Sequence, residues 1–252
     1  EAKGKAAVHC VIVGFGLQDV AEKTIFEYEN IKGEALAVPV SNINPYLVDA
    51  PDLVLEKRNQ PICIVPTISY GSMANDDGHL LLDKEQRNAL IAAEPATAPY
   101  IRRYMGAQEF LNNAERWCLW LKDISPSLMR SSNELRHRIE AVRKFRASSN
   151  REATRNLAAT PSLFGEDRQP LKSYLLLPKV SSENRPYMPI GFMPSEVIAN
   201  GSALTISDSG HYEMGVLQSK MHMAWMRAVA GRMKSDYQYS AQIVYNNFPW
   251  PD

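Results

Sequence analysis

Two short motifs near the start of this sequence have residue types that could carry chemistry. The first, Gly14-Phe15-Gly16, follows an apolar, β-branched run at residues 6–13, as the loop of a nucleotide-binding site would. A dinucleotide-binding loop needs a third glycine that opens a helix and an acidic residue about twenty positions further on. The third glycine is missing here. The sequence therefore favours a turn between two strands.

The second motif, Asn44-Pro45-Tyr46, lies close to a pattern used by enzymes that modify an exocyclic amine. In the full pattern, Asn/Asp-Pro-Pro-Tyr/Phe, carbonyl oxygens accept hydrogen bonds from the amino group and the aromatic ring stacks on a flipped base. One of the two prolines is missing here, and no cofactor-binding loop precedes the motif. We therefore interpret these residues as a structural loop.

A third group could bind a metal ion. Asp76, Asp77 and His79 lie within four positions of one another, and carboxylates and imidazole are common metal ligands. The run Asn75-Asp76-Asp77-Gly78 is also a typical tight turn, which explains the same residues more simply. A self-contained metal-dependent hydrolase that uses Asp76, Asp77 and His79 is kept as an alternative function.

Cysteine usage and hydropathy indicate the compartment. Cys10, Cys63 and Cys118 lie far apart, each inside an apolar run, so they do not form the closely spaced pair that a zinc site needs. Such isolated thiols favour a reduced, cytoplasmic protein. No uninterrupted apolar run approaches the roughly 20 residues of a membrane-spanning helix, so we expect no membrane partner.

The charges balance overall but are unevenly distributed. The chain has 28 Lys and Arg residues against 28 Asp and Glu residues. Between residues 130 and 172, ten basic residues stand against five acidic ones. One basic stretch on a neutral protein can hold a polyanion, and it can equally be the solvated face of a helix. Composition alone leaves both interpretations open.

Periodicity and breaker residues predict an α+β fold, because strands and helices mix without regular βαβ units. We expect strands at residues 6–13, 23–40 (a pair around Gly33), 115–121, 172–180, 187–192, 203–206 and 242–245. We expect helices at residues 83–93, 127–157 and 212–230, and a short one from Ala98 through Tyr104. The alternating aromatic residues of 115–121 are typical of a buried scaffold strand.

Several segments together resemble the C-terminal half of MmeI-type enzymes, which are single-chain restriction–modification proteins and their methyltransferase-only relatives. The segments are residues 43–50, 70–81, 106–110 with 115–121, 180–185, and 219–251 in several pieces. Each segment is a weak signal by itself, whereas five in the same order and spacing are a strong one. The resemblance covers essentially the whole chain.

The resemblance implies a parent protein with an N-terminal nuclease, a central adenine-N6 methyltransferase that uses S-adenosylmethionine, and a C-terminal target recognition domain. Residues 1–40 would be trailing strands of the methyltransferase domain. Residues 41–252 would be a mixed-sheet DNA target recognition domain with long helices, including a helical insertion at about 127–157. The catalytic motif and the cofactor loop would lie upstream of residue 1, so this chain itself would carry no catalytic residue, metal or cofactor. Its partners would be double-stranded DNA and the methyltransferase domain of the same chain.

Recognition requires side chains that hold the DNA backbone and others that contact base edges. We expect such contacts from the polar loop Ser181, Ser182, Glu183, Asn184 and Arg185. We also expect them from Lys220, His222, Arg232 and Lys234, and from Arg143, Lys144 and Arg146 of the basic helix. Two alternatives stay open. Glu183 and Arg185 could simply pair with each other, and the whole chain could be a structural docking domain that does not contact DNA.

Overall fold

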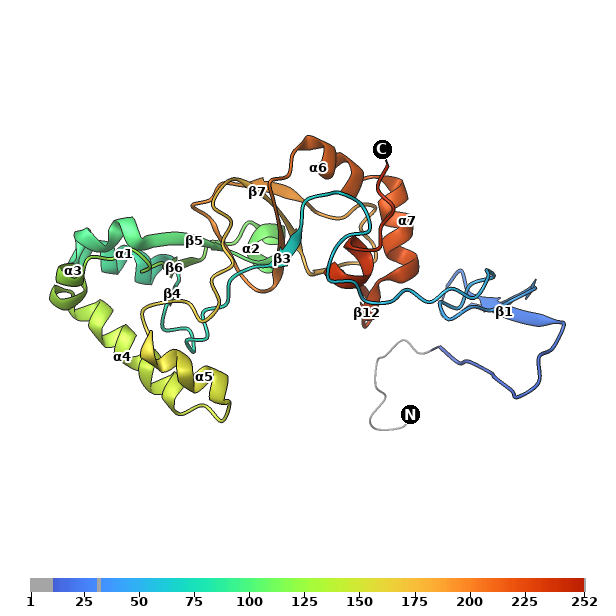
Figure 1. Ribbon diagram of the computed structural model, residues 1–252, viewed down its shortest axis with the longest axis horizontal. Coiled ribbons are helices and arrows are strands. Elements are labelled where there is room, and N and C mark those ends of the chain that lie inside the picture. The colour runs from blue at the N-terminus through green and yellow to red at the C-terminus, as the bar shows by residue number, and fades with distance from the viewer. Residues whose placement is uncertain (1–10, 31–32, 252) are drawn as a thin grey trace.

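The computed structural model describes residues 11–30 and 33–251 and shows two lobes, with an N-terminal segment to one side (Figure 1). Within these ranges the strands form four small sheets of two to four strands, and the helices are inserted between them. This mixed architecture confirms the α+β class. No helix in these ranges is long and apolar enough to cross a membrane.

The N-terminal segment contains one antiparallel hairpin. Strands β1 (Lys23–Glu27) and β2 (Leu36–Val40) pair so that Ile25 is opposite Val38. The strand pair expected over residues 23–40 is therefore confirmed. The strand expected over residues 6–13 lies mostly outside the described residues, and its described part, residues 11–13, is not in a strand.

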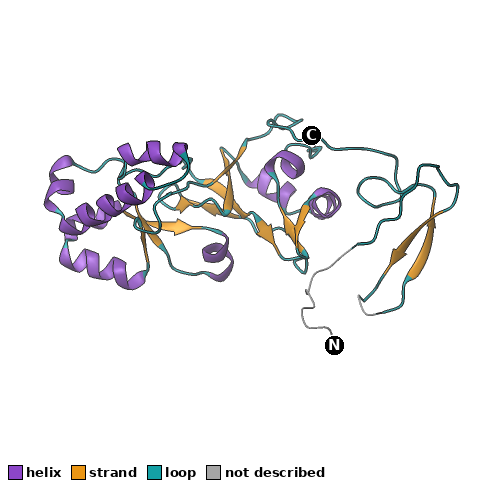
Figure 2. Ribbon diagram, turned by 90° about the horizontal axis from the view of Figure 1, so that it is seen from below, coloured by secondary structure: helices purple, strands orange, loops and turns teal. Residues whose placement is uncertain are grey.

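The first lobe is built on a four-stranded sheet with the order β10-β5-β6-β4. The strands are β4 (Leu81–Leu82), β5 (Ile101–Met105), β6 (Trp117–Leu119) and β10 (Ile198–Ala199). Around them lie α1 (Lys84–Ala93), η1 (Pro95–Tyr100), α2 (Ala107–Asn112), α3 (Pro126–Ser131), α4 (Asn133–Ala147), α5 (Glu152–Asn156) and η2 (Leu157–Ala159). Figure 2 shows most of the helices gathered at this end of the molecule. The residues of β6 are buried, which confirms that the aromatic strand is scaffold.

Two expectations for this lobe are wrong. Residues 101–105 form strand β5 where a short helix was expected. The helix expected over 127–157 is divided into α3, α4 and α5. Ser132 interrupts the helix because its backbone is extended and its hydroxyl accepts from Leu135 N at 3.0 Å, which caps a new helix.

The second lobe contains the sheet β3-β11-β7-β9 and the smaller sheet β12-β13-β8. The strands are β3 (Ile68–Tyr70), β7 (Tyr174–Pro178), β8 (Val180–Ser181), β9 (Gly191–Met193), β11 (Ala203–Ser207), β12 (Gly231–Met233) and β13 (Asp236–Gln238). The helices are α6 (His211–Leu217), α7 (Lys220–Val229) and the π-helix η3 (Ala241–Tyr245). The strand expected over 242–245 is therefore wrong, and the helix expected over 212–230 is interrupted at Ser219, which caps α7.

The two lobes meet at a close backbone contact around Asn200. A Cβ atom on Gly71 would lie 2.2 Å from the carbonyl oxygen of Asn200, and one on Gly106 would lie 2.1 Å from its side-chain amide. The Asn200 side-chain oxygen accepts from the backbone N of Ser202 at 2.8 Å and from the Ser202 hydroxyl at 2.6 Å. The junction therefore has no room for a side chain at either glycine, and it fixes the lobes relative to each other.

Candidate nucleic-acid interface

The sheet β12-β13-β8 brings together two groups of predicted contact residues that lie about fifty positions apart in the sequence. β13 pairs with β8, so that Tyr237 is opposite Ser181, and it pairs with β12, so that Tyr237 is also opposite Arg232. The loop that follows Ser181 and the turn of the β12–β13 hairpin consequently belong to one sheet. In Figure 1 this hairpin lies on the same lower side of the molecule as α4 and α5.

Arg232 occupies the centre of this surface and is held by three neighbours. Its guanidinium carbon lies 3.9 Å from the ring centroid of Tyr237, and its Nη1 donates to the carbonyl of Ser235 at 2.8 Å. The same nitrogen lies 3.9 Å from the Glu183 carboxylate. Because the Arg232 side chain is 42% exposed, the guanidinium is oriented by the protein and still accessible to a ligand.

The alternative in which Glu183 and Arg185 pair with each other is wrong. Glu183 pairs with Arg232 of the hairpin instead of with Arg185 in its own loop. The loop is shaped by its own backbone: Arg185 N donates to the Ser182 carbonyl at 3.2 Å, and Asn184 N donates to the Ser182 hydroxyl at 3.3 Å. In the described part of the chain the Arg185 side chain forms no ion pair.

Tyr237 was not expected from the sequence, although it is the residue that orients Arg232. The turn between the two strands, at Lys234 and Ser235, lacks the Asn-Gly or Asp-Gly pair that marks most two-residue hairpins. Lys234 adopts the left-handed backbone (φ 58°) that such turns need. Because lysine rarely adopts this conformation, the sequence contains no signal for a hairpin turn at this position.

Two of the expected lysines are exposed, Lys234 on this surface and Lys220 at the end of α7 that lies away from β12. Lys234 lies at the tip of the hairpin, and Lys220 is the first residue of α7. Neither lysine forms an ion pair with any other described residue. Their ammonium groups are therefore available to an anionic partner.

Ser181 and His222 are buried, contrary to expectation. Ser181 is 2% exposed and His222 is fully buried. His222 Nε2 lies 2.9 Å from the hydroxyl of Tyr239, and its ring packs edge-on against Phe248. Burial lowers the pKa of His222 to about 4, so this imidazole is neutral near pH 7. Neither residue is part of the surface, because neither side chain reaches solvent.

Arg146 is also fully buried, and the expectation that it holds phosphate is wrong for that reason. Its five N–H groups donate to five backbone carbonyls at 2.7–3.0 Å, namely those of Ala74, Asn75, Leu157, Thr160 and Leu163. Arg146 thus ties α4 to the loop after β3, to η2 and to the segment that follows η2. It is a structural residue.

Four of the ten basic residues at positions 130–172 form ion pairs on the surface. Arg138 pairs with Glu134, Arg143 with Glu140, Arg168 with Glu166, and Lys172 with Asp208. Lys144 is exposed and has no ion-pair partner among the described residues. Of the three residues expected from this helix, Lys144 is therefore available to a ligand. Arg143 is 56% exposed, and its ion pair with Glu140 is long at 3.8 Å.

The residues of the metal-site alternative do not converge. Asp76 is 5% exposed, and its Oδ2 accepts from Leu80 N at 2.5 Å, which closes the turn. Asp77 is exposed and adopts the left-handed backbone of the turn, at φ 52°. Among residues 11–30 and 33–251, no three His, Cys, Asp or Glu side chains lie close enough together to hold a metal ion. These residues are better explained as the turn before β4.

The Asn44-Pro45-Tyr46 motif is a self-contained turn. The Asn44 side-chain oxygen accepts from Tyr46 N at 2.9 Å and from Val48 N at 3.4 Å, and Asn44 is 6% exposed. The Tyr46 hydroxyl accepts from Leu55 N at 2.9 Å. The Asn44 side chain and the Tyr46 hydroxyl are thus both engaged inside the loop, which fits the structural interpretation.

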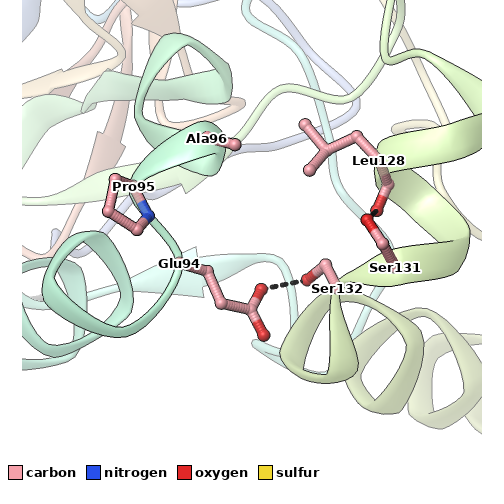
Figure 3. A pocket seen from close by; sticks show the side chains of 6 residues that line it. All are labelled: Glu94, Pro95, Ala96, Leu128, Ser131 and Ser132. Carbon is pink, nitrogen blue, oxygen red and sulfur yellow. Dashed lines mark hydrogen bonds between the residues drawn. The ribbon is translucent and has the colours of Figure 1, made fainter.

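A pocket of about 190 Å³ lies between α1 and α3 and is lined by Glu94, Pro95, Ala96, Leu128, Ser131 and Ser132 (Figure 3). The Glu94 carboxylate accepts from the Ser132 hydroxyl, from Asn133 N at 3.1 Å and from Glu134 N at 3.3 Å. Glu94 therefore neutralises the positive end of α4, as a carboxylate at a helix N-terminus does. The polar groups of this pocket stabilise the helix and leave little for a ligand.

An exposed polar loop and hairpin, mounted on a rigid two-lobed α+β scaffold, define this chain as a recognition domain. The chain belongs to the family described as MmeI, target recognition domain, whose model matches residues 49–252. This confirms the family that the sequence motifs indicated.

Two relatives illustrate the family. The chain is 38% identical over its whole length to DNA methyltransferase A of Bacillus subtilis (strain 168) and covers 28% of that protein. A solved structure of the Type IIL restriction-modification enzyme MmeI in complex with DNA matches the whole chain at 47% identity with a TM-score of 0.95, over 34% of that protein. The chain thus spans about a third of the length of the relatives that it matches.

Proposed function

We propose that this chain recognises a specific double-stranded DNA sequence on behalf of a DNA methyltransferase of which it is the recognition part. The observation that carries the proposal is the joining of the 182–185 loop and the β12–β13 hairpin in one sheet. This arrangement presents an oriented guanidinium, a carboxylate, an amide and free cations on one exposed surface. These are the groups that contact base edges and phosphates.

The roles follow from how each side chain is held. Arg232 and Glu183 are restrained by each other and by the hairpin, so they suit contacts to base edges, where geometry determines specificity. Asn184 and Ser182 offer neutral donors and acceptors on the same loop. Lys220, Lys234, Arg185, Arg143 and Lys144 suit phosphate contacts, because a flexible cation needs no fixed geometry to neutralise a phosphate.

The division of the chain follows the same proposal. Residues 1–40 belong to the methyltransferase part as its trailing strands, and residues 41–252 form the recognition domain with its helical insertion at about 127–157. The family match over residues 49–252 and the unpaired edges of the β1–β2 hairpin support this division. S-adenosylmethionine is bound by the catalytic part, the methylated group is the adenine N6, and the protein acts in the cytoplasm.

A salt series on the full-length protein tests the proposal. We expect the double variant Lys220→Ala/Lys234→Ala to bind DNA more weakly and to flatten the dependence of log K on log salt by about 0.9 for each phosphate that is no longer neutralised. Lys84→Ala is the matched control, since Lys84 is exposed, pairs with Glu115 and lies in the first lobe. An unchanged slope in the double variant would instead support a docking domain that does not contact DNA.

A further inference from the structure

The chain between β2 and β3 is fastened to the C-terminal residues over a short stretch, residues 56–66, which we call the strap. In Figure 1 the strap passes beside the C-terminal residues, which are drawn in red. Its contacts join positions that lie about 180 residues apart in the sequence, such as Arg58 and Asn247. This fastening is much denser than a solvent-exposed linker requires.

Asn247 forms the first part of the fastening. Its side-chain oxygen accepts from Arg58 Nε at 2.9 Å, and its amide donates to the Glu56 carbonyl at 3.0 Å. The same amide donates to the Gln242 carbonyl of the π-helix η3 at 2.9 Å. Asn247 is 6% exposed, so the bonds lie in an interior where they are costly to break.

Asn246 forms the second part. Its amide donates to the Arg58 carbonyl at 2.7 Å, and its own carbonyl accepts from Ile62 N at 2.9 Å. Arg58 N donates to the Gln242 carbonyl at 3.1 Å. The strap is therefore bonded on both its backbone and its side chains. The π-helix η3 supplies one of these acceptors, the Gln242 carbonyl, and π-helical turns occur frequently at functional positions.

The strap follows the β1–β2 hairpin, which has no further strand beside it among the described residues. In the described part of the chain, β1 and β2 pair only with each other, so both outer edges of the hairpin are open. Phe26 is 61% exposed and Leu36 is 65% exposed. An isolated two-stranded hairpin with apolar side chains in solvent is marginally stable, so it needs further strands or a packing partner. In the proposed parent protein, that partner is the methyltransferase part.

We infer that Arg58, Asn246 and Asn247 are positioning residues that fix the recognition domain at a set angle to the methyltransferase part. The inference rests on the proposed function. The strap connects the hairpin of the methyltransferase part to the lobe that carries Arg232, and these three residues lock the strap to that lobe. A target site held by the recognition domain is thereby delivered to the catalytic centre in one orientation. Misplacement of a reacting group by about 1 Å can cost a factor of about 100 in rate.

The test uses the full-length protein and measures DNA binding separately from single-turnover methylation. For Asn247→Ala, we expect the Kd for the target site to stay within about threefold, and the methylation rate at saturating DNA to fall tenfold or more. Arg58→Ala removes only one side-chain bond from an exposed strap residue and should lower the same rate with the fold intact. Arg58→Lys, which keeps a cationic donor, should recover part of it. Lys57→Ala is the matched control, because Lys57 is an exposed neighbour with no ion pair among the described residues.

The outcomes separate the two proposals. A fall in rate with unchanged Kd and unchanged site preference supports the positioning role. A rate that does not change in either alanine variant overturns it, and so does a loss of rate that higher DNA concentrations fully restore. If Asn247→Ala unfolds in thermal melts, the Arg58 variants decide the question. Wild-type protein that binds its site and methylates no DNA would overturn the proposed function, and this inference with it.

Discussion

The guanidinium carbon of Arg232 lies 3.9 Å from the ring centroid of Tyr237, directly across the β12–β13 pair. A cation–π contact at a half-exposed site is worth about 0.5–1 kcal/mol and restricts the rotamers of the arginine. The tyrosine therefore orients Arg232 before any ligand arrives. Preorganisation of this kind lowers the entropic cost of forming a bidentate contact.

We expect Arg232→Ala to weaken binding of the target duplex by about 1–3 kcal/mol, the range for one bidentate base contact. The loss should be much smaller on duplexes changed at the base pair that Arg232 contacts, because that contact is already absent there. Fluorescence anisotropy with a panel of single-substituted duplexes measures both effects. Tyr237→Phe keeps the stacking ring and should behave almost as wild type. Equal weakening on every duplex would assign Arg232 to a phosphate instead.

Arg146 should matter for stability and not for DNA contact. Removing its five donors, as in Arg146→Met, leaves five carbonyls without this partner and should cost about 3–5 kcal/mol of unfolding free energy. Urea denaturation followed by circular dichroism measures the change. Arg143→Met on the exposed face of the same helix is the control and should cost no more than about 0.5 kcal/mol. Similar midpoints for the two variants would contradict the structural role of Arg146.

The sequence predicted the fold class and about half of the described strands correctly, because these depend on local signals. The helix expected over residues 83–93 is confirmed as α1, which Asp83 caps by accepting from Gln86 N at 2.8 Å. The interruptions at Ser132 and Ser219 were missed because the apolar periodicity continues through them. Periodicity reports which face of a segment is buried, and the capping hydrogen bond that ends a helix leaves that pattern intact.

The candidate site was predicted in part, for a different physical reason. The loop Ser182–Asn184 and the exposed Lys234 could be chosen by residue type alone. Residue type does not tell whether a side chain is buried or exposed in the folded protein. His222 and Arg146 carry the polar groups expected of a DNA-binding residue, yet both are fully buried. Their partners, a tyrosine hydroxyl and five carbonyls, come from distant segments that no spacing rule connects. The strap contacts of Asn247 were missed for the same reason.

The glycines at the lobe junction should not tolerate a side chain. A Cβ on Gly71 would lie 2.2 Å from the Asn200 carbonyl oxygen, so Gly71→Ala forces the backbone apart and should cost more than about 2 kcal/mol. Gly215→Ala is the matched control, since a Cβ there would meet nothing within 4 Å and Gly215 lies inside α6. That change should stabilise the protein by about 0.5–1 kcal/mol. Thermal and urea unfolding measure both, and a neutral Gly71→Ala would show that the junction can adjust.

The buried His222 should make the protein less stable as the pH falls. The pKa of its imidazole is about 4 in the folded protein, because of burial, against an ordinary value of 6.5. Below pH 6.5 the His222 imidazole is protonated in the unfolded chain, whereas in the folded protein it stays neutral down to about pH 4. The contribution of His222 to stability is therefore fully present above pH 6.5 and is lost between pH 6.5 and 4, with a total on the order of 3 kcal/mol.

Unfolding free energies measured at intervals from pH 7.5 to pH 4.5 test this dependence, with His222→Gln compared at each pH. Glutamine keeps a polar group near the Tyr239 hydroxyl and does not titrate, so the difference between wild type and variant isolates the imidazole. We expect wild type to lose its advantage over the variant steadily below pH 6.5. A difference that stays constant over this range would mean that His222 accepts a proton in the folded state as readily as in the unfolded one.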